Sequence, residues 1–197
     1  ALFLQETPSL DHYEVRPSSV TTLAPGRLLV DFGKEWVGTL ALEAFGKSGE
    51  RVEIRHGEEL LPDDQGVRWE MRCHCKYREE WILSGRQPDS LDFFDYKAFR
   101  WVELLYPEGV RLSGIRLLAR HYPIGAASKG GVRHDDRGFP IHAVRLSSRD
   151  PLLKPAWDLC AHGLMVGVQE NFLDCPTREK GQYLGDLSVS GHGHFYL

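Results

Sequence analysis

Short apolar runs separated by turn residues are the feature of this sequence that most restricts its fold. Within them apolar and polar residues alternate, as is typical of strands that bury one face. Gly, Pro and Asp residues separate the runs, and strands at this spacing predict a β-sandwich. The turn-forming Gly46-Lys-Ser-Gly49 further predicts a hairpin between its two flanking strands. The expected strands cover residues 28–32, 38–45, 51–56, 79–83, 99–106 and 109–120.

After Ser147 the apolar residues recur at steps of three and four, which predicts an amphipathic helix. Asp150-Pro151 is a good start for this helix, with Asp as N-cap and Pro in the first helical position. Pro155 lies inside the pattern and predicts a kink or a later start. We expect a second helical stretch from the Asp174-Cys-Pro176 turn to about Val189. The apolar stripe comprises Leu153, Trp157, Cys160, Leu164 and Val168.

These changes of pattern divide the chain into four parts. We expect an irregular connector over 1–26, a β-sandwich domain over 27–123, a Gly-rich linker over 124–147 and a helical part over 148–197. The helical part is too short to build a core of its own, so it needs further helices. The chain starts at Ala1 without an initiator Met and ends on apolar residues, so we expect it to be a piece of a longer protein. Its compartment therefore stays open between cytoplasmic and secreted.

Composition and charge exclude several classes of partner. The chain has 24 Lys and Arg against 28 Asp and Glu, whereas nucleic-acid recognition needs a concentrated basic face. No apolar run approaches the roughly 20 residues that cross a bilayer. Cys73 and Cys75 flank His74 at the wrong spacing for a common zinc site, so we expect the cysteines to be buried free thiols. His192 and His194 could also bind a metal, but two positions apart on a helix they point to different sides, so we expect core or interface histidines there. We predict no metal and no cofactor.

The densest group of polar residues lies between Asp174 and Asp186. If the segment from Arg178 onward is helical, Glu179, Tyr183 and Asp186 share one face. Carboxyl groups and an aromatic ring on one surface suit glycoside hydrolysis, which needs a proton donor, groups that orient sugar hydroxyls and a ring that stacks on the sugar. Two alternatives stay open: Asp174 as a helix N-cap, and Glu179 and Asp186 as a solvated helix face.

The same segment resembles a signature of bacterial α-L-rhamnosidases, Asp-Cys-Pro-x-Arg-Glu followed by Gly-Asp. These are inverting glycoside hydrolases in which β-sandwich domains precede an (α/α)6 barrel. The resemblance covers about residues 27–197 and implies a β-sandwich followed by the first helices of an incomplete (α/α)6 barrel. Other segments resemble the family in the same order along the chain: Val30–Gly38, Arg55–Glu58, Phe99–Glu103, and Asp150–Leu153 with Trp157.

The resemblance also implies roles for individual residues. Glu179 matches the general acid, which protonates the departing glycosidic oxygen. Asp174 and Asp186 match carboxylates that bind rhamnose hydroxyls and stabilise the transition state, and Arg178 lies within the same substrate-binding motif. Tyr183 stands where the family often has Trp, which keeps an aromatic platform but changes the ring offered to the sugar.

The family's general base lies on a later barrel helix that this sequence does not include. On a helix, Glu179 and Asp186 would be separated by a rise of roughly 10 Å, a poor spacing for an acid and base pair. We therefore expect the isolated chain to be inactive, and its partners to be the remainder of the barrel and a rhamnose-containing glycoside or polysaccharide. The alternatives are a carbohydrate-binding or structural sandwich without activity, and a related hydrolase that acts on another sugar.

Overall fold

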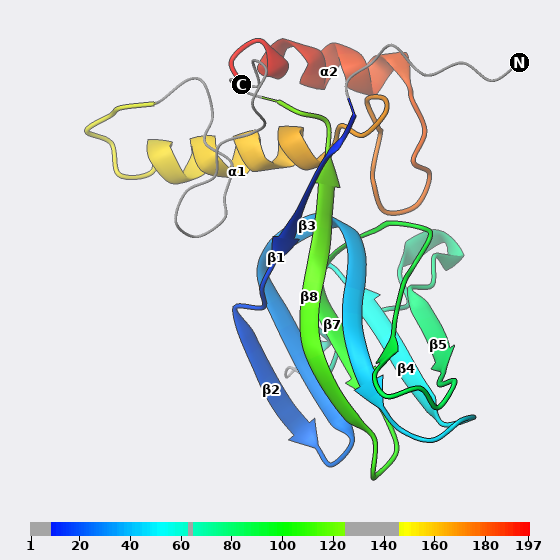
Figure 1. The fold of residues 1–197 in the computed structure, drawn as a ribbon. Helices are drawn as coiled ribbons and strands as arrows, with labels where there is room; N and C mark the ends of the chain where they lie inside the picture. Colours follow the sequence, from blue (N-terminus) through cyan, green and yellow to red (C-terminus); the bar gives the residue numbers. More distant parts are fainter. Residues whose placement is uncertain (1–8, 63–64, 125–145) are drawn as a thin grey trace, which may run out of the picture. The chain divides into compact units, whose positions relative to one another are not determined.

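The computed structural model describes residues 9–62, 65–124 and 146–197, which form mostly antiparallel strands followed by two α-helices (Figure 1). The chain divides into two compact units, one of residues 14–119 and one of residues 1–13 with 120–197. In chain order the elements are β1 (Asp11–Val15), β2 (Ser19–Ala24), β3 (Arg27–Phe45), β4 (Arg51–Gly57), the 3-10 turn Arg72–His74, β5 (Arg78–Ile82), β6 (Asp89–Ser90), β7 (Lys97–Leu105), β8 (Arg111–His121), α1 (Leu153–Val166) and α2 (Leu184–His194).

The 19-residue strand β3 organises the β-sheet unit. Its first half pairs with β2 and β7, and its second half pairs with β8 and β6. The register shifts between Asp31 and Trp36, and Gly38 then pairs with both Lys97 and Ala119. The remaining strands extend the order β1-β8-β3-β7-β4-β5. The result is the sandwich-like β architecture followed by helices that the sequence predicts.

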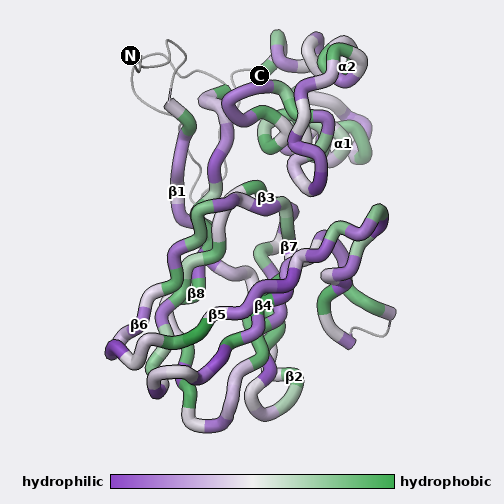
Figure 2. Tube along the Cα trace, turned by 90° about the vertical axis from the view of Figure 1, so that its right-hand side faces the viewer, coloured by the Kyte–Doolittle hydropathy of each residue, from purple (hydrophilic) through white to green (hydrophobic). Residues whose placement is uncertain are grey.

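Alternating side chains build the core of this unit. Hydrophobic and hydrophilic residues follow one another at short intervals along the strands (Figure 2). The rings of Phe32 and Phe99 meet edge to face with centroids 5.9 Å apart. Burying each large apolar side chain contributes roughly 1.5–3 kcal/mol, which makes this cluster the main stabilising element of the unit. Its largest fully buried members include Trp36, Phe32, Phe99, Leu40, Leu42, Ile54, Leu104 and Leu117.

A buried carboxylate ties a loop to three strands. Glu103 on β7 is only 1% exposed and forms ion pairs with Arg27 on β3 and Arg55 on β4. It also accepts the backbone N–H of Val67 at 3.3 Å, while Arg27 donates to the carbonyl of Gln65 at 2.7 Å. Because a buried charge is costly unless it is paired and hydrogen-bonded, these contacts hold the loop against the sheet.

Two expectations about the β region are wrong. Residues 11–15 and 19–24 of the expected connector form β1 and β2. The hairpin expected at Gly46–Gly49 does not form, because β3 and β4 are not neighbours and β7 lies between them in the strand order. The N–H of Gly49 instead donates to the carbonyl of Leu83, at 2.9 Å. Most of the expected linker, residues 125–145, lies outside the described residues.

The helices begin later than the sequence pattern predicts. The Asp150 carboxylate accepts the N–H of Leu152 at 2.9 Å in a turn, and α1 begins at Leu153. Pro155 therefore falls in the first turn, where a missing N–H leaves no helical hydrogen bond unmade. The second helix, α2, begins at Leu184 rather than near Arg178. None of the described helices is long and apolar enough to cross a membrane.

The four cysteines are free, but the expectation that they are buried is wrong. Cys73 and Cys160 are exposed, and Cys75 and Cys175 are partly exposed. Cys73 lies in a tight turn, where it has a φ of 57°.

Removing the buried carboxylate tests how much it contributes to stability. We expect Glu103→Ala to lower the free energy of unfolding by about 3 kcal/mol, because two arginines and the Val67 N–H lose their shared partner. Glu80→Ala is the matched control, since Glu80 pairs with Arg51 on an exposed surface and should contribute less than about 1 kcal/mol. Urea unfolding of both variants gives the comparison, and equal losses would contradict the role of Glu103.

Candidate functional site

A closed loop of residues 174–181, here called the acid loop, carries the candidate site. Its ends are joined by two hydrogen bonds: the N–H of Asp174 donates to the carbonyl of Gly181 at 2.8 Å, and the N–H of Gly181 donates to Asp174 Oδ1 at 2.9 Å. Lys180 donates its N–H to the carbonyl of Cys175 at 3.2 Å and has a φ of 51°. This left-handed residue turns the chain back, so the segment closes as a loop instead of starting a helix.

The loop brings two carboxyl groups into contact. The side chains of Asp174 and Glu179 are hydrogen-bonded, and their oxygens lie within 4.8 Å of one another and of the Cys175 sulfur. The guanidinium of Arg178 forms an ion pair with Glu179. The Glu179 side chain is 37% exposed, so it is accessible to a ligand while keeping its partners.

The contact shifts the pKa values of the two carboxyl groups in opposite directions. The hydrogen bond with Asp174, together with partial burial, raises the pKa of Glu179 above its usual value. Burial would also raise the pKa of Asp174, but hydrogen bonds from the Glu179 carboxyl and from the N–H groups of Cys175 and Gly181 hold it below its usual value. The two pKa values are therefore shifted in opposite directions, so Glu179 is the weaker acid of the pair and the better candidate for proton donation.

The expected common helical face of Glu179, Tyr183 and Asp186 does not form. Glu179 lies in the acid loop, Tyr183 has extended backbone just before α2, and only Asp186 is helical. The N-cap alternative for Asp174 is also wrong, because the residue at the N-cap of α2 is Tyr183. Asp186 is exposed in the first helical turn, where a negative charge is favourable.

Tyr183 nevertheless contacts the loop. A Cβ atom at Gly181 would lie 2.8 Å from the Tyr183 ring, so the ring covers the backbone at the point where the loop closes. Its side chain remains largely exposed. Gly181 was not a candidate site residue in the sequence. Its position seven residues after Asp174, just beyond a polar stretch, is the only signal that could have indicated loop closure.

The loop's donor set is a poor fit for a metal ion. Asp174, Cys175 and Glu179 are the one group of three possible ligands in the described part of the chain. The set mixes a thiol with two carboxyls, whereas hard cations prefer oxygen ligands alone. The positive charge of Arg178 against Glu179 would also oppose a bound cation. The arrangement is better suited to proton transfer than to metal binding.

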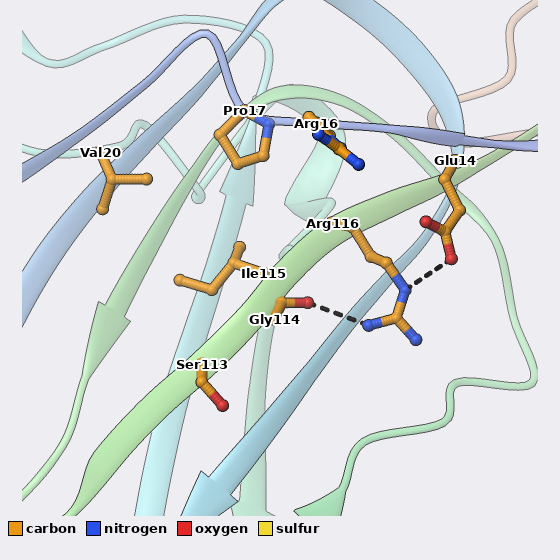
Figure 3. Close-up of a pocket in the computed structure, with 8 residues that line it drawn as sticks. All are labelled: Glu14, Arg16, Pro17, Val20, Ser113, Gly114, Ile115 and Arg116. Atoms are coloured by element: carbon orange, nitrogen blue, oxygen red, sulfur yellow. Dashed lines mark hydrogen bonds and ion pairs between the residues drawn. The ribbon is translucent and has the colours of Figure 1, made fainter.

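A second concave feature lies on the β-sheet unit. It is an open groove of about 610 Å³ between the β1–β2 connection and β8. Arg116 forms an ion pair with Glu14 at 3.0 Å and donates to the carbonyl of Gly114 at 3.0 Å. Figure 3 shows charged side chains on one side of this groove and apolar side chains on the other. Its lining residues are Glu14, Arg16, Pro17, Val20, Ser113, Gly114, Ile115 and Arg116.

Comparisons with known proteins agree on one family. A sequence model described as the bacterial alpha-L-rhamnosidase concanavalin-like domain matches residues 21–111. An α-L-rhamnosidase of Streptomyces avermitilis is 25% identical over 182 residues, which cover 89% of this chain and 16% of that protein. The chain thus spans about a sixth of the length of this curated relative.

Solved structures show the same fold. The α-L-rhamnosidase of Dictyoglumus thermophilum has a TM-score of 0.75 at 19% identity, covering 96% of this chain and 20% of that one. A Streptomyces avermitilis α-L-rhamnosidase complexed with L-rhamnose has a TM-score of 0.69 at 22% identity, covering 90% and 16%. A rhamnosidase from Klebsiella oxytoca with rhamnose bound has a TM-score of 0.67 at 20% identity, covering 93% and 40%.

The effect of Asp174 on the pKa of Glu179 can be tested on this chain alone. In Asp174→Asn the new side chain keeps an oxygen for the Gly181 N–H but presents an amide donor to Glu179. This donor favours the ionised carboxylate, so we expect the pKa of Glu179 to fall and the group to lose its proton at a lower pH. Carbon-detected NMR titration of the Glu179 carboxyl measures the change.

Asp158→Asn is the control for that titration, because Asp158 pairs with Lys154 on the exposed side of α1. It removes a carboxylate from the same unit and should leave the Glu179 titration unchanged. A Glu179 pKa that is the same in Asp174→Asn and in the unmodified chain would refute the proposed coupling.

Proposed function

We propose that this chain is part of a glycoside hydrolase that releases terminal α-L-rhamnosyl units with inversion, because residues 21–111 match the bacterial alpha-L-rhamnosidase concanavalin-like domain. The observation that carries this proposal is the acid loop, in which the Glu179 carboxyl is hydrogen-bonded to Asp174 and has a pKa raised above its usual value. The chain then contributes the sandwich-like unit and the start of the helical domain that bears the proton donor.

In this proposal Glu179 is the general acid. Its carboxyl gives a proton to the glycosidic oxygen as the bond to the anomeric carbon breaks, and the leaving group departs as a neutral alcohol. Asp174 keeps its negative charge beside Glu179 and stabilises the positive charge that develops on the sugar ring. Arg178 limits the rise in the Glu179 pKa, because the guanidinium favours the ionised form. The acid therefore stays strong enough to donate its proton.

Asp174 is too close to Glu179 to serve as the base. Inverting enzymes place their two carboxyl groups roughly 6.5–9.5 Å apart, so that a water molecule fits beside the sugar. The oxygens of Asp174 and Glu179 lie within 4.8 Å and share a hydrogen bond, which leaves no room for that water. We therefore assign the general base to a part of the protein outside this chain, and the 197 residues alone should be inactive.

Tyr183, Asp186 and Arg178 are the proposed substrate-binding residues. The Tyr183 ring is fixed on one side by Gly181 and exposed on the other, which supports stacking on the apolar face of a sugar. Asp186 is exposed one helical turn later and can accept hydrogen bonds from sugar hydroxyls. The ligand class is a rhamnose-containing glycoside or polysaccharide.

Exposed apolar side chains support further helices as partners of α1 and α2. Leu159, Leu184 and Val189 are between 74% and 83% exposed, and Phe195 just after α2 is 85% exposed. Several large apolar side chains this exposed on two short helices are uncommon unless another element covers them. The remainder of a helical barrel would bury these residues.

The decisive test is Glu179→Gln in the longer reading frame that contains this chain. The variant keeps the shape of the side chain but has no proton to give, so kcat/KM should fall about 10²- to 10⁴-fold on phenyl α-L-rhamnoside. The loss should be smaller on the 4-nitrophenyl rhamnoside, whose leaving group needs little protonation. Glu108→Gln, in an exposed turn of the β-sheet unit, is the control.

Undiminished hydrolysis of the phenyl substrate by Glu179→Gln would remove Glu179 from the role of acid. The same assay with a panel of other aryl glycosides separates a rhamnosidase from a related hydrolase that prefers another sugar. If another glycoside is hydrolysed faster, Glu179 remains the proposed general acid and the proposed substrate changes.

A second candidate function, saccharide binding without catalysis, is favoured by the groove on the β-sheet unit. Its charged wall of Glu14, Arg16 and Arg116 faces apolar side chains, including Val20 and Ile115 (Figure 3). Sugars offer hydroxyls and apolar C–H faces together, and a hollow of about 610 Å³ is within the size range of small-ligand sites.

Titrating the 197-residue chain with L-rhamnose, observed by amide NMR, tests this second function. Binding in the groove should shift the amides of residues 113–116, and Arg16→Ala with Val20→Ser should weaken the binding at least tenfold. Arg51→Ala changes a comparable exposed arginine on β4 and should have no effect. Unchanged amides at residues 113–116 would exclude the groove as a rhamnose site.

A further inference from the structure

Gln169 is a polar side chain in a fully buried position just before the acid loop. It is 0% exposed, and each polar atom of its amide is used. Its Oε1 accepts from Arg120 Nε at 3.0 Å, and its Nε2 donates to the carbonyls of Arg120 and Val166, both at 3.2 Å. A buried amide costs free energy unless it is hydrogen-bonded, so this set of bonds strongly favours one orientation of the side chain.

These bonds join three parts of the helical unit. Arg120 lies at the end of β8, Val166 is the last residue of α1, and Gln169 lies in the turn that follows. The same turn is closed by a bridge between Val168 and Phe172 and by the Gln169 N–H, which donates to the carbonyl of Asn171 at 3.0 Å. We call this group of contacts the Gln169 clamp.

Further contacts reinforce the clamp from outside. The guanidinium of Arg120 also forms an ion pair with Glu170, and the N–H of Tyr122 donates to the carbonyl of Val168 at 2.9 Å. Arg120 therefore contacts two consecutive residues of the turn through different nitrogens. A planar guanidinium with several donors can hold both at once, which a lysine could not reproduce.

The clamp is connected directly to the acid loop. Leu173 donates its N–H to the carbonyl of Gly167 at 3.0 Å, and the next residue is Asp174, whose two hydrogen bonds with Gly181 close the loop. A shift of the turn would move Asp174, and with it the partner of the Glu179 carboxyl. Displacements of about 1 Å at a reacting group can cost roughly 10²-fold in rate.

From this connection we propose that Gln169 and Arg120 are positioning residues that hold the carboxyl groups of Asp174 and Glu179 in the geometry needed for proton donation. The proposal rests on the proposed function for its catalytic meaning. Neither residue touches the reacting atoms, and both act through the backbone between Val168 and Asp174.

The test uses Gln169→Leu, which retains the approximate size of the side chain but none of its hydrogen bonds, and Arg120→Lys, which keeps the charge but loses the Nε donor. In the longer protein we expect kcat on phenyl α-L-rhamnoside to fall about ten- to hundredfold with KM changed less than threefold. In the 197-residue chain we expect the Glu179 carboxyl to titrate closer to an ordinary glutamate. Arg120→Lys gives the second measurement if Gln169→Leu does not fold.

Gln87→Leu is the matched control, because Gln87 also donates to a backbone carbonyl, that of Gly46 at 2.9 Å, in the β-sheet unit. It should lower stability without changing kcat or the Glu179 titration. A folded Gln169→Leu or Arg120→Lys variant with unchanged kcat and an unchanged Glu179 titration would overturn the proposal. If the unmodified longer protein cleaves no rhamnoside, the proposed function fails, and the Glu179 titration still decides whether the clamp positions the loop.

Discussion

Strand β3 is 19 residues long, and its backbone N–H and C=O groups need hydrogen-bond partners on both edges along that length. This requirement shapes the β-sheet unit. No single pair of strands accompanies it for that length. β2 and β7 pair with its first half and β8 and β6 with its second, around a bend where Gly33 has a φ of 77°. Gly38, which is shared between β7 and β8, has no room for a side chain, because a Cβ there would lie 2.1 Å from the Leu118 carbonyl. This bend converts one long strand into the common element of two groups of strands.

The acid loop shows how a reactive carboxyl can be tuned by local closure. Two backbone hydrogen bonds between Asp174 and Gly181 hold the loop, and the side chains of Asp174 and Glu179 meet as a result. Since the carboxyls share a hydrogen bond, ionising one makes it harder to ionise the other. The Gln169 clamp gives this partly exposed loop a buried anchor in the preceding turn. The carboxyl pair in the loop and the buried hydrogen bonds of Gln169 are therefore parts of the same local structure.

The alternation of apolar and polar residues predicted the strands that bury one face. It did not predict strands without a buried face. β2 is almost entirely exposed and rich in Ser and Thr, so it carries no apolar pattern and is held by its pairing with β3. The predicted start of α2 was wrong for a different reason. Lys180 adopts a left-handed backbone conformation, which a lysine in the sequence does not predict. In the candidate site the sequence pointed to Asp174, Arg178 and Glu179, which do lie together. It did not indicate that they meet in a loop, or that Gly181 and Gln169 hold it.

The sequence by itself determined which segments could form strands and helices, because side-chain period is set locally by backbone geometry. It also carried the motif that places two carboxyl groups, an arginine and a cysteine within a few residues of one another. Only the tertiary structure decided that β7 separates β3 from β4, that Glu103 is buried between two arginines, and that Glu179 shares a hydrogen bond with Asp174. Strand pairing and burial depend on atoms far apart in the chain, so no local pattern could specify them. The pKa of Glu179 depends on a backbone turn that has no periodic signal in the sequence.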